Sequence, residues 1–404
     1  MRITIIADSF PPLKNSAAVL VFSLAEALAA LDHEVLVITP SSGIEDPSLE
    51  EDFGAFKVLR LRCGEIKSQI KLLRGIEELS LFFKLPRALK NTSYKSYVPD
   101  LIIWYSPSIF FGGLVKSLKH ASNTSYLILR DIVPQWLVDL GLMRKGLSYY
   151  LLRWFELYQY RQADFIGVQS SGNRIYLENL ELPSLQKLEV LPNWMPSIST
   201  QFKILDLENS HTNLSRTKLA GKKTLIYAGN LGEAQGVKNL AQLLSCLRNN
   251  DQIGFLIIGR GSKKVWLQEF IDFNDLTNVL MLDEMDLVTL NMYYQQSVAG
   301  LVFLDLSHQS HNIPGKFISY LEAGLPVVAC VNANNDLVGI INNSGLGLVG
   351  NNPVALAKEL ISFVDKIPEN SSILARKYYD ENYQPQAIAK QILKTVKMSK
   401  ELSN

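Results

Sequence analysis

The sequence has few cysteines and histidines, the residues that build disulfides and zinc sites, and it has no excess of basic residues. Only three cysteines and five histidines occur in 404 residues. The cysteines, Cys63, Cys246 and Cys330, have no paired spacing, so neither a disulfide framework nor a metal site is expected. The 40 basic residues are balanced by 39 acidic ones, and this composition gives no indication of a nucleic-acid partner.

Long hydrophobic runs are also missing. No segment approaches the roughly 20 uninterrupted apolar residues that cross a bilayer. The first residues, Met1–Ala7, already follow a strand pattern and contain no signal-peptide core. We therefore expect a cytoplasmic protein, and the composition leaves open whether it touches a membrane surface.

What is present indicates a globular α/β protein. Hydrophobic residues make up 47% of the chain and charged residues 20%, and a chain of this length favours two domains of about 150–200 residues. Ile3–Ala7 and Glu34–Thr39 have strand patterns, and apolar residues recur at helical spacing in Ala17–Leu31. This β-α-β order predicts a parallel sheet with the loop 8–16 at its carboxyl edge, where ligands bind.

The second half repeats this alternation after a polar stretch. Strand patterns at 224–228, 253–258 and 299–304 alternate with helical patterns at 237–248 and 286–296. The expected fold class is α/β, with two doubly wound, Rossmann-like domains facing a central cleft. The expected boundaries are an N-terminal domain at 1–195, a linker at 196–222, a second domain at 223–380, and a C-terminal helix in 381–404 that packs back on the first domain.

Three glycine-bearing loops of the second half follow neighbouring strands, at 229–236, 259–261 and 311–316. Glycine lets backbone N–H groups approach a ligand closely, and Lys316 adds a positive charge at a helix start. Each loop alone fits an ordinary strand-loop-helix unit, but together they predict a site for a nucleotide diphosphate. The candidate binding residues in them are Gly229, Asn230, Gly232, Gln235, Gly236, Gly259, Arg260, His311, Asn312, Pro314, Gly315 and Lys316.

Two further features belong to the first half. Arg130 and Asp131 end a strand pattern that begins at Tyr126, where a carboxylate serves either catalysis or helix capping. Residues 57–95 hold ten basic residues against three acidic ones. A basic amphipathic helix in this stretch either lies on an anionic membrane or buries one face in the core.

Several short motifs carry a resemblance to a known family. The sequence resembles the GT-B glycosyltransferases of family 4, which include sucrose synthases and mannosyltransferases. The motifs are Phe10–Pro12, His33–Val35, Pro192–Asn193, Tyr227–Gly232 and Gly324–Val327. Further motifs are similar to bacterial O-antigen and capsule N-acetyl-L-fucosamine transferases: Arg130–Asp131, Gln235–Gly236 and Asn312–Phe317.

This resemblance implies a retaining hexosyltransferase that needs neither a metal nor a cofactor. It implies that the second domain binds a nucleotide sugar, most simply a UDP-sugar. It also implies that the first domain binds a lipid-pyrophosphate-linked saccharide as acceptor. Stretch 57–95 would then hold the protein on the inner face of the cell membrane.

The sequence departs from the family pattern at several positions. Asn15 and Ser16 stand where the family has two glycines near the N-terminus, and Asn230 and Gln235 stand at its diphosphate-binding Arg and Lys. Lys316 is the natural replacement for that positive charge. His311 and Ser319 stand at the family's pair of glutamates, and Glu322 is an alternative to the second, ribose-binding one. Asp131 matches the family's catalytic position, with Arg130 either orienting it or binding an acceptor phosphate.

Two other functions share this pattern. A non-hydrolysing UDP-sugar 2-epimerase has the same two-domain architecture and would convert its donor without an acceptor. A non-catalytic, nucleotide-sugar-binding subunit of a polysaccharide assembly complex is compatible with the missing pair of glutamates.

Overall fold

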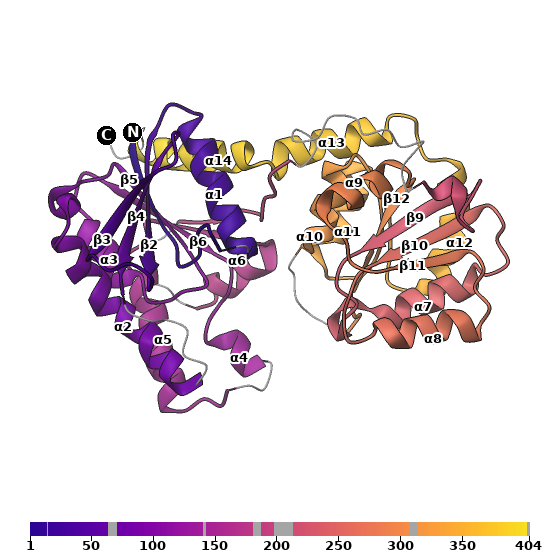
Figure 1. Cartoon of the computed structure of the whole chain (residues 1–404), viewed down its shortest axis with the longest axis horizontal. Coiled ribbons are helices and arrows are strands. Elements are labelled where there is room, and N and C mark those ends of the chain that lie inside the picture. Colours follow the sequence, from indigo (N-terminus) through magenta and orange to yellow (C-terminus); the bar gives the residue numbers. More distant parts are fainter. Residues whose placement is uncertain are drawn as a thin grey trace. The chain divides into compact units, whose positions relative to one another are not determined.

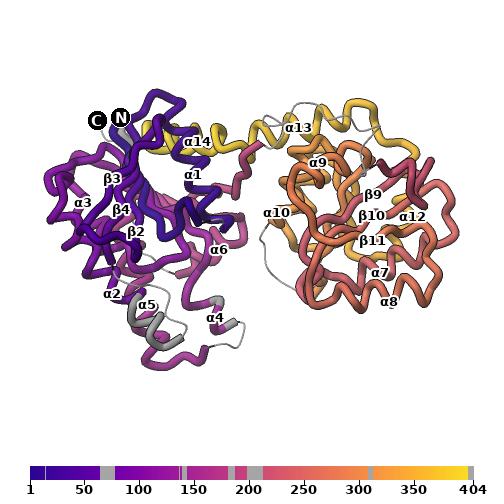
Figure 2. Tube along the Cα trace, in the orientation of Figure 1, coloured from indigo at the N-terminus to yellow at the C-terminus, as the bar shows by residue number. Residues whose placement is uncertain are grey.

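The computed structural model describes residues 1–13, 15–63, 71–139, 143–180, 187–197, 213–307 and 313–401 (Figures 1 and 2). The chain forms two compact units, Met1–Pro192 with Pro385–Asn404, and Asn193–Gln384. It therefore passes from one unit to the other twice, once after Pro192 and once after Gln384. Among the described residues, no helix has the length and apolar character needed to cross a membrane.

The first unit is built on an eight-stranded sheet in the order β3-β4-β2-β1-β5-β6-β7-β8. Every pairing is parallel except that of β3, which runs antiparallel to β4 at the sheet edge. The central strands are nearly continuous runs of buried aliphatic residues, as parallel sheets covered on both faces require. The strands are β1 (Arg2–Ile6), β2 (Glu34–Ser41), β3 (Ser48–Asp52), β4 (Lys57–Arg62), β5 (Leu101–Tyr105), β6 (Thr124–Leu129), β7 (Phe165–Val168) and β8 (Lys187–Val190).

Seven α-helices surround this sheet in the described part of the unit. They are α1 (Ser16–Ala29), α2 (Lys71–Lys90), α3 (Gly112–Leu118), α4 (Gln135–Asp139), α5 (Leu147–Tyr160), α6 (Ser171–Glu178) and α14 (Pro385–Glu401). Helix α14 packs against α1. The side chain of Gln391 also donates a hydrogen bond of 2.8 Å to the carbonyl of Val190, which fastens α14 to the end of β8.

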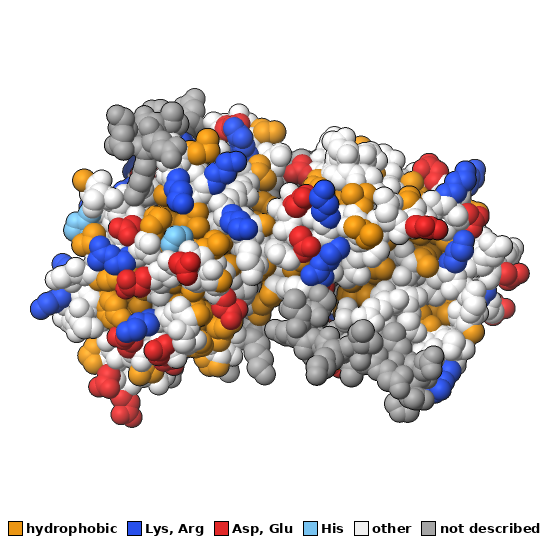
Figure 3. Space-filling model, turned by 90° about the horizontal axis from the view of Figure 1, so that it is seen from above, with side chains coloured by type: hydrophobic (Ala, Val, Ile, Leu, Met, Phe, Trp, Pro, Cys, Tyr) orange, Lys and Arg blue, Asp and Glu red, His pale blue; other side chains and the backbone are white. Residues whose placement is uncertain are grey.

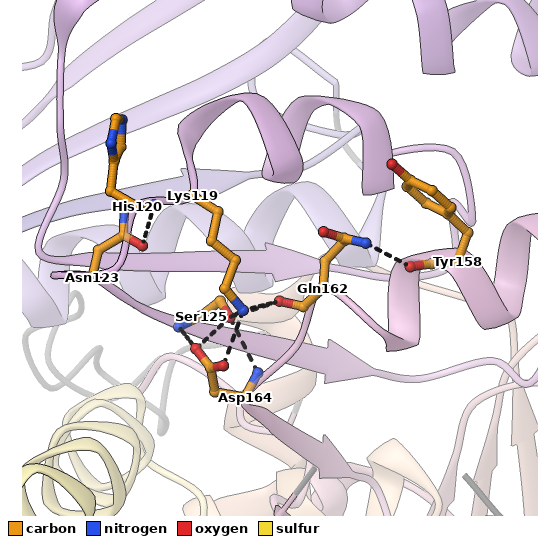
Figure 4. Close-up of polar contacts among 7 residues, drawn as sticks. All are labelled: Lys119, His120, Asn123, Ser125, Tyr158, Gln162 and Asp164. Carbon is orange, nitrogen blue, oxygen red and sulfur yellow. Dashed lines mark hydrogen bonds and ion pairs between the residues drawn. The ribbon is translucent and has the colours of Figure 1, made fainter. Parts of the chain in front are cut away.

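A polar cluster joins the starts of two neighbouring strands at the amino edge of this sheet (Figure 4). Lys119, just after α3, donates to the carboxylate of Asp164 at 2.9 Å and to the carbonyl of Gln162 at 2.8 Å. The other oxygen of Asp164 accepts from the backbone N–H of Ser125 at 2.8 Å. The cluster thus connects the start of β6 to the segment that enters β7, at the edge opposite the carboxyl ends of the strands.

The second unit holds a six-stranded parallel sheet in the order β11-β10-β9-β12-β13-β14. Successive residues of β9 point to opposite faces, with Leu225 and Tyr227 in one core cluster and Ile226 and Ala228 in another. The strands are β9 (Lys223–Ala228), β10 (Ile253–Ile258), β11 (Val279–Leu282), β12 (Ala299–Phe303), β13 (Val327–Cys330) and β14 (Gly347–Gly350).

Helices cover both faces of this second sheet (Figure 1). One face carries α7 (Val237–Cys246), α8 (Lys264–Phe273) and α12 (Pro353–Asp365). The other carries α9 (Leu287–Gln295), α10 (Gly315–Glu322), α11 (Asp336–Ser344) and α13 (Ser371–Asn382). The predicted α/β class with two parallel sheets is therefore confirmed.

Only part of the basic stretch 57–95 is helical. Residues Lys57–Arg62 form β4, in which Lys57 and Arg60 pair with Glu50 and Glu51 of β3 at 2.8 and 2.7 Å. The basic helix expected in this stretch corresponds to α2. On the face shown in Figure 3, Lys and Arg side chains are interspersed with Asp and Glu, in keeping with the balanced composition.

Candidate active site

Two glycine loops of the second unit lie directly against each other. Gly229 follows β9 and Gly259 follows β10, and a Cβ on Gly259 would lie 1.9 Å from the carbonyl oxygen of Gly229. A Cβ on Gly261 would lie 2.5 Å from the carbonyl of Leu231. Because no other residue fits at such distances, glycine is required for this approach. The N–H of Leu231 completes the junction by donating to the carbonyl of Arg260 at 2.7 Å.

The loop after β9 also packs on the chain that leaves β12. Gly236 has a left-handed φ of 56°, and its Cβ would lie 2.5 Å from the carbonyl of Leu304. The N–H of Asp305 donates to the carbonyl of Ala234 at 3.1 Å. Since β10, β9 and β12 are neighbours in the sheet, the loops after β9 and β10 and the chain that leaves β12 lie at one carboxyl edge. Of the third predicted loop, 311–316, residues 311 and 312 lie outside the described residues.

Lys316 lies at the centre of this junction. It is the second residue of α10, and its Nζ donates to Tyr227 Oη at 2.8 Å and to Gln235 Oε1 at 2.7 Å. The same Nζ lies 4.2 Å from the centroid of the Tyr227 ring. Burial away from water lowers the pKa of Lys316 to about 7.

The partners of this lysine are neutral. Tyr227 holds its own hydroxyl in place by donating to the carbonyl of Asn230 at 2.7 Å. Within the described part of the chain, no carboxylate pairs with Lys316. An anion placed here would restore the charge balance of a buried ammonium group, and a phosphate at a helix start suits that role.

Other predicted binding residues lie around this junction in different settings. Asn230 and Arg260 are exposed, and Arg260 pairs with Glu284 at 3.1 Å. Gly232 immediately precedes a short 3₁₀ helix, Glu233–Gln235, which carries Gln235. Pro314 and Gly315 begin α10, and Gly315 is exposed with no atom within 4 Å of an added Cβ. His311 and Asn312 lie outside the described residues.

Ser319 and Glu322 both contact other parts of the unit. Ser319 donates to Met195 Sδ at 3.3 Å and to the carbonyl of Gly315, in its own helix, at 3.2 Å. Glu322 is only 2% exposed, and its carboxylate accepts from Ser197 at 2.8 Å and from Arg376 at 3.1 Å. Arg376 lies on α13, so Glu322 connects α10 to α13.

In the first unit, Asn15 and Ser16 begin α1. The side-chain oxygen of Asn15 accepts from the N–H of Ala18 at 2.8 Å, and its amide group donates to Ser9 Oγ at 3.2 Å. Asn15 is therefore an N-cap in this structure, and Ser16 is the first helical residue.

Arg130 and Asp131 are neighbours in sequence, but their side chains have different environments. Arg130 is buried and donates to the carbonyls of Leu191 and Pro192 at 2.6 and 3.2 Å. Asp131 reaches solvent, and partial burial raises the pKa of its carboxyl while the charge of Arg130 lowers it. The guanidinium therefore holds the chain that follows β8, and the carboxylate of Asp131 lies at the carboxyl edge of β6.

A pocket at this edge of the first unit includes part of the loop 8–16 that the sequence places there, together with residues of α2, α4 and α5 that the sequence did not single out. Its volume is about 780 Å³, and it is lined from the ends of β1, β2 and β5 and from α2, α4 and α5. Asp8, directly after β1, lines this pocket, and burial raises the pKa of its carboxyl. The position of Asp8 at a strand end was the available signal, but α2, α4 and α5 could not be placed over it from sequence.

The two units correspond to two family models. Residues 17–194 match the model described as "Glycosyl transferase 4-like domain", and residues 222–366 match "Glycosyl transferases group 1". The sucrose-phosphate synthase structure from Thermosynechococcus elongatus superposes with a TM-score of 0.68 at 16% identity, covering 99% of both chains. The chain is a glycosyltransferase with the GT-B fold.

Two curated proteins are similar to this glycosyltransferase over most of its length. The probable glycosyltransferase WbjE of Pseudomonas aeruginosa is 23% identical over 62% of this chain and 62% of its own length. The putative colanic acid biosynthesis glycosyl transferase WcaI of Escherichia coli is 23% identical over 83% of this chain and 85% of its own. A glycosyltransferase of this kind uses a nucleotide-sugar donor and a saccharide acceptor.

Proposed function

We propose that this glycosyltransferase moves a sugar from a UDP-sugar to a lipid-pyrophosphate-linked saccharide, with retention of configuration, in O-antigen or capsule assembly. The sugar that the resemblance favours is N-acetyl-L-fucosamine. The similarity to WcaI, a putative colanic acid biosynthesis glycosyl transferase, supports assignment to the assembly of a polysaccharide.

The observation that carries this proposal is the environment of Lys316. Its partly buried ammonium has two neutral partners and lies at the start of α10, beside the glycine-bearing loops that follow β9 and β10 at the carboxyl edge of the second sheet. A diphosphate in that position would accept hydrogen bonds from Lys316 and from backbone N–H groups at the start of α10. Stabilising the leaving diphosphate with such fixed donors would replace a divalent metal.

The first unit would bind the acceptor. We propose that Asp131 acts beside the reacting carbon, because its carboxylate is left to solvent at the carboxyl edge of the sheet. Arg130 would support it by holding the chain after β8 through the carbonyls of Leu191 and Pro192.

We also propose that the enzyme touches the inner face of the cell membrane through α2 and the neighbouring α5. Phe82 of α2 and Trp154 of α5 have ring centroids 6.0 Å apart, so the two helices are adjacent. Leu147, Tyr150 and Phe83 on them are 92%, 63% and 52% exposed. Apolar side chains beside the basic residues of α2 suit an anionic lipid surface.

One observation favours a second candidate function. The carboxylate of Glu322 is occupied by Ser197 and Arg376, so an alternative to the family's ribose-binding glutamate is already in use. A non-catalytic, nucleotide-sugar-binding subunit would fit that arrangement.

A thermal-shift panel of UDP, GDP and ADP, each with and without Mg²⁺, tests the donor assignment. We expect stabilisation by UDP alone and no dependence on Mg²⁺. Equal stabilisation by all three nucleotides, a requirement for Mg²⁺, or no stabilisation at all would contradict it.

A further inference from the structure

Another pocket of the first unit lies where α14 packs beside α1 (Figure 1). Its volume is about 390 Å³, within the range of small-molecule sites. Leu31 follows α1 and His33 immediately precedes β2, so this pocket lies at the amino edge of the sheet, away from the strand ends that carry Asp131. The remaining lining residues belong to α14: Lys390, Leu393, Lys394, Lys397 and Met398.

The three lysines line this pocket from one face of α14. Lys390, Lys394 and Lys397 are four and three residues apart, and this spacing places them side by side on a helix. The opposite face of the helix, with Ile392 and Val396, is buried. All three lysines are exposed, and none forms an ion pair or a hydrogen bond with a described residue. Because ammonium groups at this spacing repel one another, an anion held among them would remove an unfavourable interaction.

The other residues around the pocket leave this positive charge in excess. No aspartate or glutamate lines the pocket in the described part of the chain. Burial lowers the pKa of His33, the charges of the N-terminal amine and of Lys397 lower it further, and Asp32 opposes them. Asp32 therefore offsets one charge of three. The side chains of residues 399–404 lie outside the described part, and they include one lysine and one glutamate, whose charges cancel.

The pocket also has an apolar side. Leu393 is 7% exposed and Leu31 is partly buried, whereas Met398 is 53% exposed. A flexible thioether such as that of Met398 adapts to ligands of different shape. A small inorganic anion would leave this apolar surface in contact with water, so the pocket suits an anion that carries an apolar group.

Three ammonium groups suit a phosphate better than a carboxylate. A phosphate monoester carries close to two negative charges at neutral pH and three terminal oxygens, so each lysine can donate to a different oxygen. A carboxylate has a single charge and two oxygens. Lysine binds phosphate as a compact charge on a flexible stem, which lets the three side chains converge on one group.

From this combination we propose that the pocket between α14 and the start of β2 binds a phosphate group that carries an apolar substituent. This site is distinct from the junction around Lys316 and from the carboxyl edge of the first sheet. The inference goes beyond the proposed function and does not rest on it. Two sources offer this chemistry, a free phosphorylated metabolite and the headgroup of an anionic phospholipid.

Three probes test the proposal: n-hexyl phosphate, inorganic phosphate and hexanoate. Each is titrated into the full chain labelled with carbon-13 at the methionine methyl groups, and Met398→Leu assigns the Met398 signal. We expect n-hexyl phosphate to shift this signal, with a Kd about tenfold lower than those of the other two probes. An unmoved Met398 signal, or an equal Kd for inorganic phosphate or hexanoate, would overturn the proposal.

Charge-removing variants connect binding to the lysines. Lys394→Gln combined with Lys397→Gln should raise the Kd of n-hexyl phosphate by about tenfold or more. Lys358→Gln combined with Lys366→Gln is the matched control, because both residues are exposed and belong to the second unit. Circular dichroism shows that each variant is folded. Equal affinities of the two double variants would remove the lysines of α14 from this role.

Sedimentation with phosphatidylglycerol vesicles then identifies the source of the phosphate. The chain with Leu147→Ser and Tyr150→Ser is the background, so that the surface proposed on α5 does not contribute. Lower sedimentation after Lys394→Gln and Lys397→Gln would support a phospholipid headgroup. Unchanged sedimentation, together with lysine-dependent binding of n-hexyl phosphate, would support a free phosphorylated ligand.

Discussion

The Nζ of Lys316 lies 2.7 Å from Oε1 of Gln235, so the start of α10 is joined to the loop that follows β9. The two residues are 81 positions apart in sequence. This contact places the ammonium of Lys316 on a neutral amide, in a region where burial lowers the pKa of the lysine to about 7. A diphosphate would compete with Gln235 for the ammonium and would be the stronger acceptor.

Replacing Lys316 by alanine should weaken UDP binding by about 10- to 100-fold, since a charge-assisted hydrogen bond contributes about 1.5–3 kcal/mol. Calorimetric titration of UDP measures the change. Lys238→Ala on α7 is the matched control, because Lys238 is exposed. Equal loss of affinity in both variants would show that Lys316 has no special role.

The lowered pKa of Lys316 also predicts how stability depends on pH. Its folded-state pKa is about 7 and its ordinary value is 10.5. The cost of burying the ammonium is therefore fully present below pH 7 and disappears as the pH rises toward 10.5.

Lys316→Met removes that cost. The variant should have a higher free energy of unfolding than the wild type at pH 6. The difference between the two free energies should be smaller by about half or more at pH 9. Urea unfolding at both pH values measures the difference, with Lys238→Met as the control for general effects of pH. An advantage that grows with pH would contradict the assigned pKa.

Gly259→Ala should separate the two glycine loops. The added Cβ would lie 1.9 Å from the carbonyl oxygen of Gly229, so the backbone must shift. We expect a loss of about 2–4 kcal/mol in the free energy of unfolding, together with weaker UDP binding. Gly43→Ala is the control, because nothing lies within 4 Å of a Cβ there. Similar stability of the two variants would show that the loops need not touch.

The combined substitution Leu147→Ser and Tyr150→Ser tests the membrane surface on α5. Loss of two exposed apolar side chains should lower sedimentation with vesicles of anionic phospholipid by about tenfold or more. Phe273→Ser is the control, because Phe273 is 91% exposed but lies on α8 of the other unit. Unchanged vesicle binding in the Leu147 and Tyr150 variant would contradict this surface.

Much of the arrangement at the carboxyl edge of the second sheet can be predicted from the sequence. Strand patterns order β9, β10 and β12, and the position of each glycine after a strand places Gly229 and Gly259 on the same edge. The helix that begins at Pro314-Gly315 likewise carries Lys316 to that edge. These features depend on local patterns and on the general geometry of parallel sheets.

Contacts between distant segments could not be predicted in this way. Glu322 lies on a helix with a pattern that fits either a ligand or a core contact, and only the position of Arg376 on α13 decides between them. Strand β4 was not predicted from the sequence, because its basic residues made it part of a basic stretch. Lys57, Arg60 and Arg62 lie among the buried residues Val58, Leu59 and Leu61. The charges of Lys57 and Arg60 are paired with Glu50 and Glu51 of the neighbouring strand, which composition cannot reveal.

We propose that the sugar leaves a UDP donor for a lipid-linked acceptor without help from a metal. To test this, we would incubate the protein with radiolabelled UDP-N-acetyl-L-fucosamine or UDP-N-acetylglucosamine and lipid-pyrophosphate-linked saccharides extracted from bacterial membranes, in EDTA. We expect label in the butanol-soluble lipid. We also expect that Asp131→Asn binds UDP normally and transfers label about 100-fold more slowly. Normal UDP binding with no labelled lipid from either donor would contradict this proposal in favour of a non-catalytic subunit, and a changed sugar without acceptor would indicate an epimerase.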